Sequence, residues 1–244
     1  MSLPYENYIF DLYGTLVDIR TDERGRALWE KTALYYGEHG AHYEAKELRA
    51  AYLRLCAREQ ARRKDPLYEL ELRRVFRALY EEKGVCPDRR RVEDTAVCFR
   101  LQSLKKLRVY PWVRSAFAEL RARGAKLYLL SNAQACFTLP ELRLLELHDA
   151  FDGVVISSDA HWKKPDPRIM RALLDGYKLA PERCLMTGND QHTDVLVARA
   201  VGMDALYLQT GTSGVYDPAL KAEFELLDGD FSRIPSLLGI HTII

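Results

Sequence analysis

Polar residues that could take part in catalysis recur in this sequence after short apolar runs. The groups are Asp11, Ser131 with Asn132, Lys164, and the pair Asp190 and Asp194. A serine hydroxyl and backbone N–H groups can hold an anionic oxygen, and a lysine brings positive charge to the same place. Each group alone has an ordinary explanation, since Ser-Asn also makes turns and a helix cap accounts for Asp194, although not for Asp190. Together and in this order they predict one site.

Asp11 is expected to stand at the mouth of that site. The run before it, Tyr8 to Phe10, is apolar and β-prone, which predicts a short strand with the acid at its tip. Ligands of open parallel α/β sheets bind beyond the carboxyl ends of the strands. Gly14 follows closely and allows the backbone to turn beneath the carboxylate.

After Tyr110 the sequence alternates regularly between helical and strand patterns. The expected strands are 126–130, 153–156, 183–187, 205–209 and 225–227, and the expected helices are 113–123, 140–147, 167–177, 194–201 and 231–238. Several of these helices have proline near the start and glycine at the end, as helix termini favour. Repeated α-β units predict an α/β fold, a Rossmann-like, doubly wound parallel sheet with right-handed crossovers. The polar groups above therefore fall at one edge of the sheet.

A helical block separates the first strand from the rest of the sheet. Apolar residues at helical spacing predict helices at 44–64, 67–83 and 92–104. The block contains 22 Lys plus Arg against 15 Asp plus Glu between residues 20 and 108, so it is basic and the remainder of the chain is acidic. We predict a core domain of residues 1–18 and 109–244, with residues 19–108 inserted as a helical cap beside the site.

Composition excludes several classes of protein. The net charge is +1, and the arginine clusters at 62–63 and 89–91 lack interleaved aromatic residues, so we expect no nucleic-acid partner. We expect no membrane segment and no leader peptide, and therefore a cytoplasmic protein. Five cysteines without metal-ligand spacing are expected to be reduced thiols. The sequence does not indicate an oligomeric state.

Four segments resemble, in order, the motifs of the haloacid dehalogenase superfamily of hydrolases. DLYGTLVD is similar to its first motif, LLSNA to its second, WKKPDPRI to its lysine motif and TGNDQHTD to its acidic fourth motif. The helical insert after the first motif resembles the subgroup with a helical cap of the first type. The resemblance covers nearly the whole chain, and it is specific for the superfamily rather than for a substrate.

The resemblance implies a covalent mechanism for a small phosphate ester. Asp11 is then the nucleophile, and an aspartyl intermediate divides one hard displacement into two easier ones. Ser131 would hold phosphoryl oxygens, and Lys164, which directly precedes the proline of its motif, would offset their charge. The backbone amides near Tyr13, Gly14 and Asn132 would contribute to binding, and Thr15 would steady the loop and the bound substrate.

The resemblance also implies Mg²⁺ as cofactor. Its ligands would be the carboxylates of Asp11 and Asp190, the backbone carbonyl of Tyr13, and waters, a set of oxygen donors that suits this ion. Asp194 would orient Lys164 or a metal-bound water rather than bind the ion itself.

Tyr13 departs from the pattern of the phosphatases in this superfamily. They usually carry a second aspartate at this position, two residues after the nucleophile, as general acid and base. A phenol is a poor base at neutral pH, and the loss of such a group costs about 10² to 10⁴ in rate. Tyrosine here resembles the metal-independent 2-haloacid dehalogenases, whereas an acid at Asp190 resembles the phosphatases.

Three further interpretations therefore stay open beside a phosphatase. The first is a dehalogenase-like hydrolase and the second a weakly active binding or regulatory protein. The third is a phosphonate hydrolase, which would need a lysine reaching in from the cap; Lys31 and Lys46 are available, but no motif supports either of them.

Overall fold

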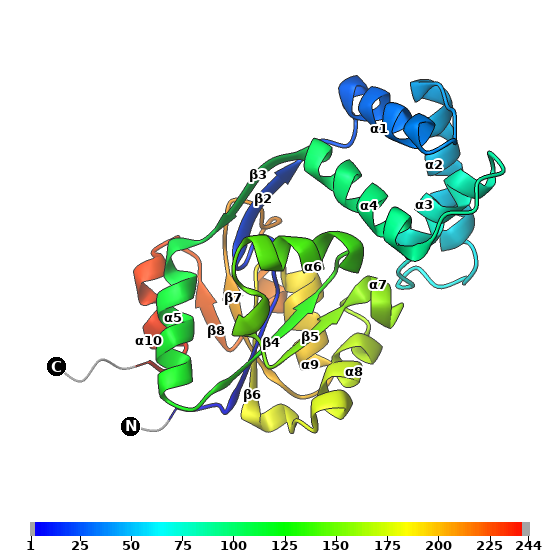
Figure 1. Cartoon of the computed structure of the whole chain (residues 1–244). Coiled ribbons are helices and arrows are strands. Elements are labelled where there is room, and N and C mark those ends of the chain that lie inside the picture. Colours follow the sequence, from blue (N-terminus) through cyan, green and yellow to red (C-terminus); the bar gives the residue numbers. More distant parts are fainter. Residues whose placement is uncertain (1–2, 241–244) are drawn as a thin grey trace.

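The structure, a computed structural model, describes residues 3–240 and confirms the predicted fold class. Six parallel strands form one sheet in the order β5-β4-β1-β6-β7-β8, and helices cover both of its faces (Figure 1). The strands are β1 (Asn7–Phe10), β4 (Lys126–Ser131), β5 (Gly153–Ile156), β6 (Cys184–Gly188), β7 (Asp204–Leu208) and β8 (Phe224–Leu226). Every strand pair in this sheet is parallel, as the alternating pattern predicts.

The two faces of the sheet bury separate hydrophobic clusters. Successive side chains of a strand point to opposite faces, so Tyr8 and Phe10 lie in one cluster and Ile9 in the other. The helices that pack on these faces or connect the strands are α5 (Pro111–Ala122), α6 (Ala135–Leu144), α7 (Ser157–Ala160), α8 (Pro167–Tyr177), α9 (Leu196–Arg199) and α10 (Ile234–Leu237). Burial on both faces explains why the strands are continuous apolar runs.

β1 occupies the central position that creates the site. It pairs with β4 on one side and β6 on the other, and the connections leave in opposite directions from it. The Asp11 N–H continues the ladder by donating to the carbonyl of Thr187, with an N···O distance of 2.9 Å. Asp11 therefore leaves the sheet where the strand order reverses, which is where ligands of open α/β sheets bind.

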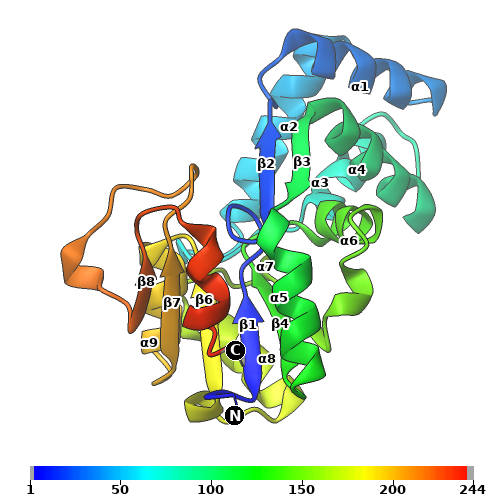
Figure 2. The same ribbon diagram turned by 90° about the vertical axis from the view of Figure 1, so that its left-hand side faces the viewer.

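The helical block forms a separate four-helix insert of residues 26–103. Its helices are α1 (Arg26–Glu38), α2 (Ala45–Gln60), α3 (Leu72–Glu81) and α4 (Arg89–Ser103). They bury a third hydrophobic cluster, in which Trp29 packs on Tyr52 and Phe99 with ring centroids 5.3 and 5.5 Å apart. Trp29 is thus a core residue, and the helices lie beyond one end of the sheet (Figures 1 and 2).

A two-stranded antiparallel ribbon joins the insert to the sheet, and sequence analysis did not predict it. It consists of β2 (Val17–Thr21) and β3 (Leu104–Val109) (Figure 2). The predicted domain limits fall within these two strands. Their residues are a mixture of polar and apolar types, most of them partly buried or exposed, so the ribbon lacks the apolar run that marked the other strands.

The start of α6 also differs from the prediction. Pro140 was expected to begin the helix, but α6 begins at Ala135 and Pro140 lies inside it. The N–H of Ala135 donates to the hydroxyl of Ser158, at 2.9 Å, so a residue of α7 satisfies a backbone donor of the first turn. When a distant residue satisfies the first turn of a helix, the sequence near that turn contains no capping residue that would predict the start.

Candidate active site

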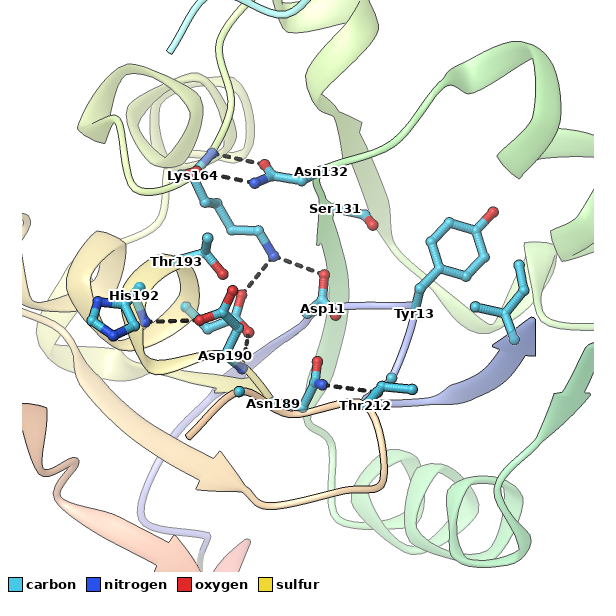
Figure 3. A pocket seen from close by; sticks show the side chains of 14 residues that line it. Asp11, Tyr13, Ser131, Asn132, Lys164, Asn189, Asp190, His192, Thr193 and Thr212 are labelled. Atoms are coloured by element: carbon cyan, nitrogen blue, oxygen red, sulfur yellow. Dashed lines mark hydrogen bonds and ion pairs between the residues drawn. The ribbon is translucent and has the colours of Figure 1, made fainter. Parts of the chain in front are cut away.

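The predicted catalytic residues line one pocket of about 530 Å³ at the carboxyl ends of β1, β4 and β6 (Figure 3). The lining residues that carry the argument are Asp11, Ser131, Asn132, Lys164, Asp190 and Asp194. Four segments that are far apart in the sequence therefore meet in one place, as sequence analysis expected. Asn189 and His192 line the same pocket and had no predicted role.

Lys164 forms the centre of the site. Its ammonium group donates to Asp11 Oδ1 at 2.7 Å, to Asp194 Oδ1 at 2.6 Å and to the carbonyl of Leu130 at 3.0 Å (Figure 3). An ammonium group has three hydrogen atoms, so these three contacts use all of them. The Lys164 side chain is buried, and the two carboxylates supply the charge that a buried ammonium requires.

The electrostatics of this cluster act in opposite directions on its members. Burial lowers the pKa of Lys164, but the attraction of Asp11 and Asp194 outweighs burial and holds its pKa above the usual value. Burial raises the pKa of Asp194 to about 7, although Lys164 opposes this shift. The pair of carboxylates therefore keeps Lys164 charged in the site.

Asp190 and Asp194 have the reverse of the structural roles that capping suggested. A π-helical turn, Gln191–Val195, follows β6, and Asp190 is its cap residue, whose Oδ1 accepts from the N–H of His192 at 2.9 Å. Asp194 lies inside the turn, is buried, and accepts from the N–H of Asp190 at 3.0 Å as well as from Lys164. The interpretation of Asp194 as the cap was thus wrong, because the turn begins four residues earlier. Capping uses one carboxylate oxygen of Asp190. The other oxygen remains free, in a residue that lines the pocket.

Gly188 makes room for the carboxylate of Asp194. A Cβ atom at Gly188 would lie 2.1 Å from Asp194 Cγ. We expect Gly188→Ala to displace Asp194 and with it Lys164, and to lower kcat/KM by about 10²-fold, because small misplacements of catalytic groups have effects of this size. Gly176→Ala is the control, since Gly176 lies in α8 with open space around it. Steady-state kinetics of the two variants measures the effect, and equal activity would contradict it.

Thr15 and Gly14 shape the loop after β1 rather than contact the substrate. Thr15 is fully buried and does not line the pocket, which corrects its expected place among the substrate-binding residues. Its hydroxyl lies 3.0 Å from Asp11 Oδ2 and 3.1 Å from Asn189 Oδ1, so it fixes the orientation of the carboxylate. Gly14 has φ of +85°, and a Cβ there would lie 2.5 Å from the Asn189 amide nitrogen.

The Gly14 backbone amide is also unavailable for a substrate. It donates to the carbonyl of Val17 at 2.8 Å, which corrects the expectation that it holds a phosphoryl oxygen. Gly14 does line the pocket, and its left-handed conformation lets the loop pass close to Asn189 and Thr212. Its contribution is therefore the shape of the loop.

Ser131 and Asn132 follow β4 and have different tasks. The Asn132 side chain accepts from the backbone N–H of Lys164 at 2.7 Å and donates to its carbonyl at 3.0 Å, so it holds the lysine loop against β4. The Ser131 hydroxyl is buried, lines the pocket, and has no hydrogen-bond partner among the described residues. A buried polar group without a partner is costly, and an acceptor bound in the pocket would remove that cost.

The Tyr13 side chain points away from Asp11 and Lys164 (Figure 3). Its hydroxyl contacts the Glu141 carboxylate on α6 and lies 3.1 Å from the Thr138 hydroxyl. Arg100 of α4 donates to the other oxygen of Glu141 at 2.6 Å. Burial and the Glu141 carboxylate raise the pKa of the Tyr13 phenol above its usual value. The hydroxyl that replaces the expected acid is thus bound outside the site.

The donor set beside Asp11 fits a hard divalent cation. Three carboxylates of the pocket, Asp11, Asp190 and Asp194, face one ammonium group, that of Lys164, and Asp190 makes no ion pair with any described residue. Within residues 3–240 no group of three or more His, Cys, Asp or Glu side chains is arranged to hold a metal. A site of two carboxylates completed by a backbone carbonyl and waters is the type that Mg²⁺ uses.

The four-helix insert contributes no described side chain to the pocket lining. Outside the sheet and its loops, the lining includes only Ile19, from β2 of the ribbon. Lys31 and Lys46 do not line it either, so neither is positioned for the lysine chemistry of a phosphonate hydrolase. The helices described for residues 3–240 are too short or too polar to cross a membrane. The five cysteines are all unpaired.

Comparison with known proteins identifies relatives over most of the chain. The family model for haloacid dehalogenase-like hydrolases matches residues 5–202. Phosphoserine phosphatase from Thermus thermophilus is 32% identical over 193 residues, which are 79% of this chain and 75% of that protein. Seven further curated relatives, named phosphoglycolate phosphatase or glyceraldehyde 3-phosphate phosphatase, are matched over only 41% to 55% of their own length.

Solved structures with both kinds of chemistry share the fold. A 2-haloacid dehalogenase from Pseudomonas syringae superposes with a TM-score of 0.63 at 21% identity, over 96% of this chain and 98% of that chain. A HAD phosphatase from Thermococcus onnurineus superposes with a TM-score of 0.59 at 20% identity, over 98% of this chain and 100% of that chain. At this identity the likeness shows the fold alone.

Proposed function

The chain belongs to the haloacid dehalogenase-like hydrolases, and on that premise we propose that it is a magnesium-dependent phosphatase that acts on a small phosphorylated metabolite. Residues 19–108 would serve as its cap domain. The relatives matched by sequence are phosphatases of small phosphate esters, which supports this assignment over dehalogenation.

One observation supports the phosphatase most strongly: the buried Ser131 hydroxyl without a partner, in the pocket that also contains Lys164 and Asp11. A phosphoryl oxygen would accept from this hydroxyl and satisfy it. The nearby positive charge of Lys164 favours an anion at the same position. A 2-haloacid would bring a carboxylate to the same position, so the preference for a phosphatase also rests on Asp190, an acid without an ion-pair partner among the described residues, and on the phosphatase relatives.

The proposed reaction proceeds in two displacements at phosphorus. A carboxylate oxygen of Asp11 attacks the phosphorus atom, and the bond from phosphorus to the leaving oxygen breaks with its electron pair remaining on that oxygen. Thr15 and Lys164 hold the Asp11 carboxylate through its two oxygens, which fixes its direction of attack. Water then attacks phosphorus, releases inorganic phosphate and regenerates Asp11.

Mg²⁺, when bound by Asp11, Asp190 and the Tyr13 carbonyl, would supply charge neutralisation between the nucleophile and the anionic substrate. Asp194 acts on Asp11 through Lys164, which contacts both carboxylates. Because it holds one hydrogen of the Lys164 ammonium, Lys164 remains directed between the two carboxylates. Asn132 fixes the backbone of the same lysine.

Phosphate release from p-nitrophenyl phosphate and a panel of small phosphate esters tests the proposal. We expect release with Mg²⁺ and its loss on chelation, restored by added Mg²⁺, because Asp190 forms no ion pair with any residue that the structure describes. A parallel assay measures halide release from 2-haloacids. Halide release without metal, together with no phosphate release, would establish a dehalogenase instead.

A further inference from the structure

Among the described residues that line the pocket, no side chain is placed to protonate a leaving group. Six titratable side chains line the pocket: Asp11, Tyr13, Lys164, Asp190, His192 and Asp194. Of these, Asp11 is the nucleophile in the proposed function, on which this inference rests. A general acid must reach the leaving oxygen with a free proton, so each of the others can be tested against its contacts.

Lys164 and Asp194 already use their hydrogen-bonding groups in contacts with each other and with neighbouring residues. All three hydrogens of the Lys164 ammonium are donated, to Asp11, Asp194 and the carbonyl of Leu130. Both oxygens of Asp194 accept, one from Lys164 and one from the N–H of Asp190. Protonating a leaving group from this pair would leave an uncompensated charge in a buried place.

Tyr13 and Asp190 are excluded on other grounds. The Tyr13 hydroxyl contacts Glu141 and Thr138 and points away from Asp11 (Figure 3). The Arg100 guanidinium, 2.6 Å from the second oxygen of Glu141, keeps that carboxylate in place as the acceptor. Asp190 is the proposed metal ligand and caps the π-helical turn. His192 lines the pocket but is exposed, and no described residue holds its ring toward Asp11.

From this arrangement we infer that the enzyme acts on phosphates whose leaving group is a weak base and departs without a proton, namely aryl, enol or acyl phosphates. The electron pair of the broken bond stays on the leaving oxygen as an anion, which takes its proton from solvent afterwards. Simple alkyl phosphates, whose alkoxides are strong bases, are then poor substrates.

The lack of a free proton-transferring side chain among the described pocket residues also affects the second displacement. No described pocket side chain is free to take a proton from the water that attacks the phosphorylated Asp11. Hydrolysis of this intermediate is therefore slow, and it is common to every substrate. The intermediate accumulates when its formation is fast, which produces a burst of the first product.

A series of aryl and alkyl phosphates of increasing leaving-group basicity tests the inference on the intact, Mg²⁺-loaded enzyme. We expect kcat/KM to fall about 10²- to 10⁴-fold from p-nitrophenyl to ethyl phosphate, in addition to any difference in binding, because the loss of a general acid has an effect of this size. We expect kcat to be the same for the aryl members, preceded by a burst of one phenol per enzyme. Tyr13→Phe and His192→Gln should change kcat/KM of aryl and alkyl phosphates by equal factors.

Three results would overturn the inference. Ethyl phosphate turned over as readily as p-nitrophenyl phosphate would show that a general acid operates, while leaving the phosphatase assignment intact. A variant that lost alkyl phosphate turnover alone would identify Tyr13 or His192 as that acid. No phosphate release from any member would overturn the proposed function along with the inference.

Discussion

Asp11→Asn should abolish hydrolysis, lowering kcat by about 10⁴-fold or more, because it removes the nucleophile of the first displacement. The amide keeps the size of the carboxylate, and its one oxygen can still accept from Lys164, whose ammonium lies 2.7 Å from Asp11 Oδ1. Its NH2 group then faces the Thr15 hydroxyl, 3.0 Å from Asp11 Oδ2, whose oxygen can accept. Lys164 also retains Asp194 as a partner. The variant should therefore fold and lose only its chemistry, which steady-state phosphate release and a urea unfolding curve measure together.

Asp18→Asn is the matched control for this experiment. Asp18 belongs to the same motif but pairs with Lys106 across the ribbon and does not line the pocket. A partly exposed pair of this kind contributes about 0 to 1 kcal/mol, so activity and stability should stay close to those of the native chain. Residual turnover by Asp11→Asn within tenfold of the native rate would mean that another residue attacks the substrate.

Lys164→Met should cost about 3–5 kcal/mol of the free energy of unfolding and remove activity as well. The substitution leaves the buried carboxylates of Asp11 and Asp194 together without their shared cation. Removing one partner of a buried ion pair has an effect of this size, because the remaining charge is uncompensated. Urea unfolding monitored by circular dichroism gives the change in stability.

Two variants make this prediction specific. Lys163→Met changes the adjacent, partly exposed lysine, for which the structure shows no ion pair, and should change stability by less than about 1 kcal/mol. Adding Asp194→Asn to Lys164→Met removes one of the two uncompensated charges and should restore part of the lost stability. If Lys163→Met and Lys164→Met were equally stable, the ion-pair cluster would not have the energetic role assigned here.

The catalytic cluster was predictable because its signals are local. An apolar run followed by an acid, a hydroxyl or a lysine marks a strand tip, and a parallel sheet brings its strand tips to one edge. Asp11, Ser131, Lys164 and Asp194 therefore meet as expected. The order of the strands around β1, by contrast, was not predicted, because the alternation of helices and strands is compatible with more than one order.

The features that the sequence did not reveal depend on partners far along the chain. The Tyr13 hydroxyl contacts Glu141, and the Ser158 hydroxyl accepts from the first N–H of α6. Neither contact has a pattern in the nearby sequence. Thr15 was expected to steady the loop and the bound substrate; its buried contact with Asn189, 174 positions away, has no pattern in the sequence. The ribbon strands β2 and β3 mix polar and apolar residues and are only partly buried, so they lack the apolar run that marks the strands of the sheet.

These long-range contacts affect which side chains are available in the pocket, and they affect the fold less. Tyrosine at position 13 could have been a weak acid or base in the pocket or a residue of dehalogenase type, and the sequence left both open. Its contact with Glu141, which Arg100 of α4 holds from the other side, removes the hydroxyl from the pocket and joins the four-helix insert to the loop of the nucleophile. Residue type alone did not determine the direction of this side chain.

The most direct test of the central claim is to locate the covalent intermediate. The native enzyme, mixed with p-nitrophenyl phosphate and Mg²⁺, is quenched in acid during the burst, digested, and analysed by tandem mass spectrometry. We predict a phosphoryl group on Asp11, and none in Asp11→Asn treated in the same way. Turnover with no phosphoryl group at Asp11, or with one on another residue, would contradict the assignment of Asp11 as the nucleophile.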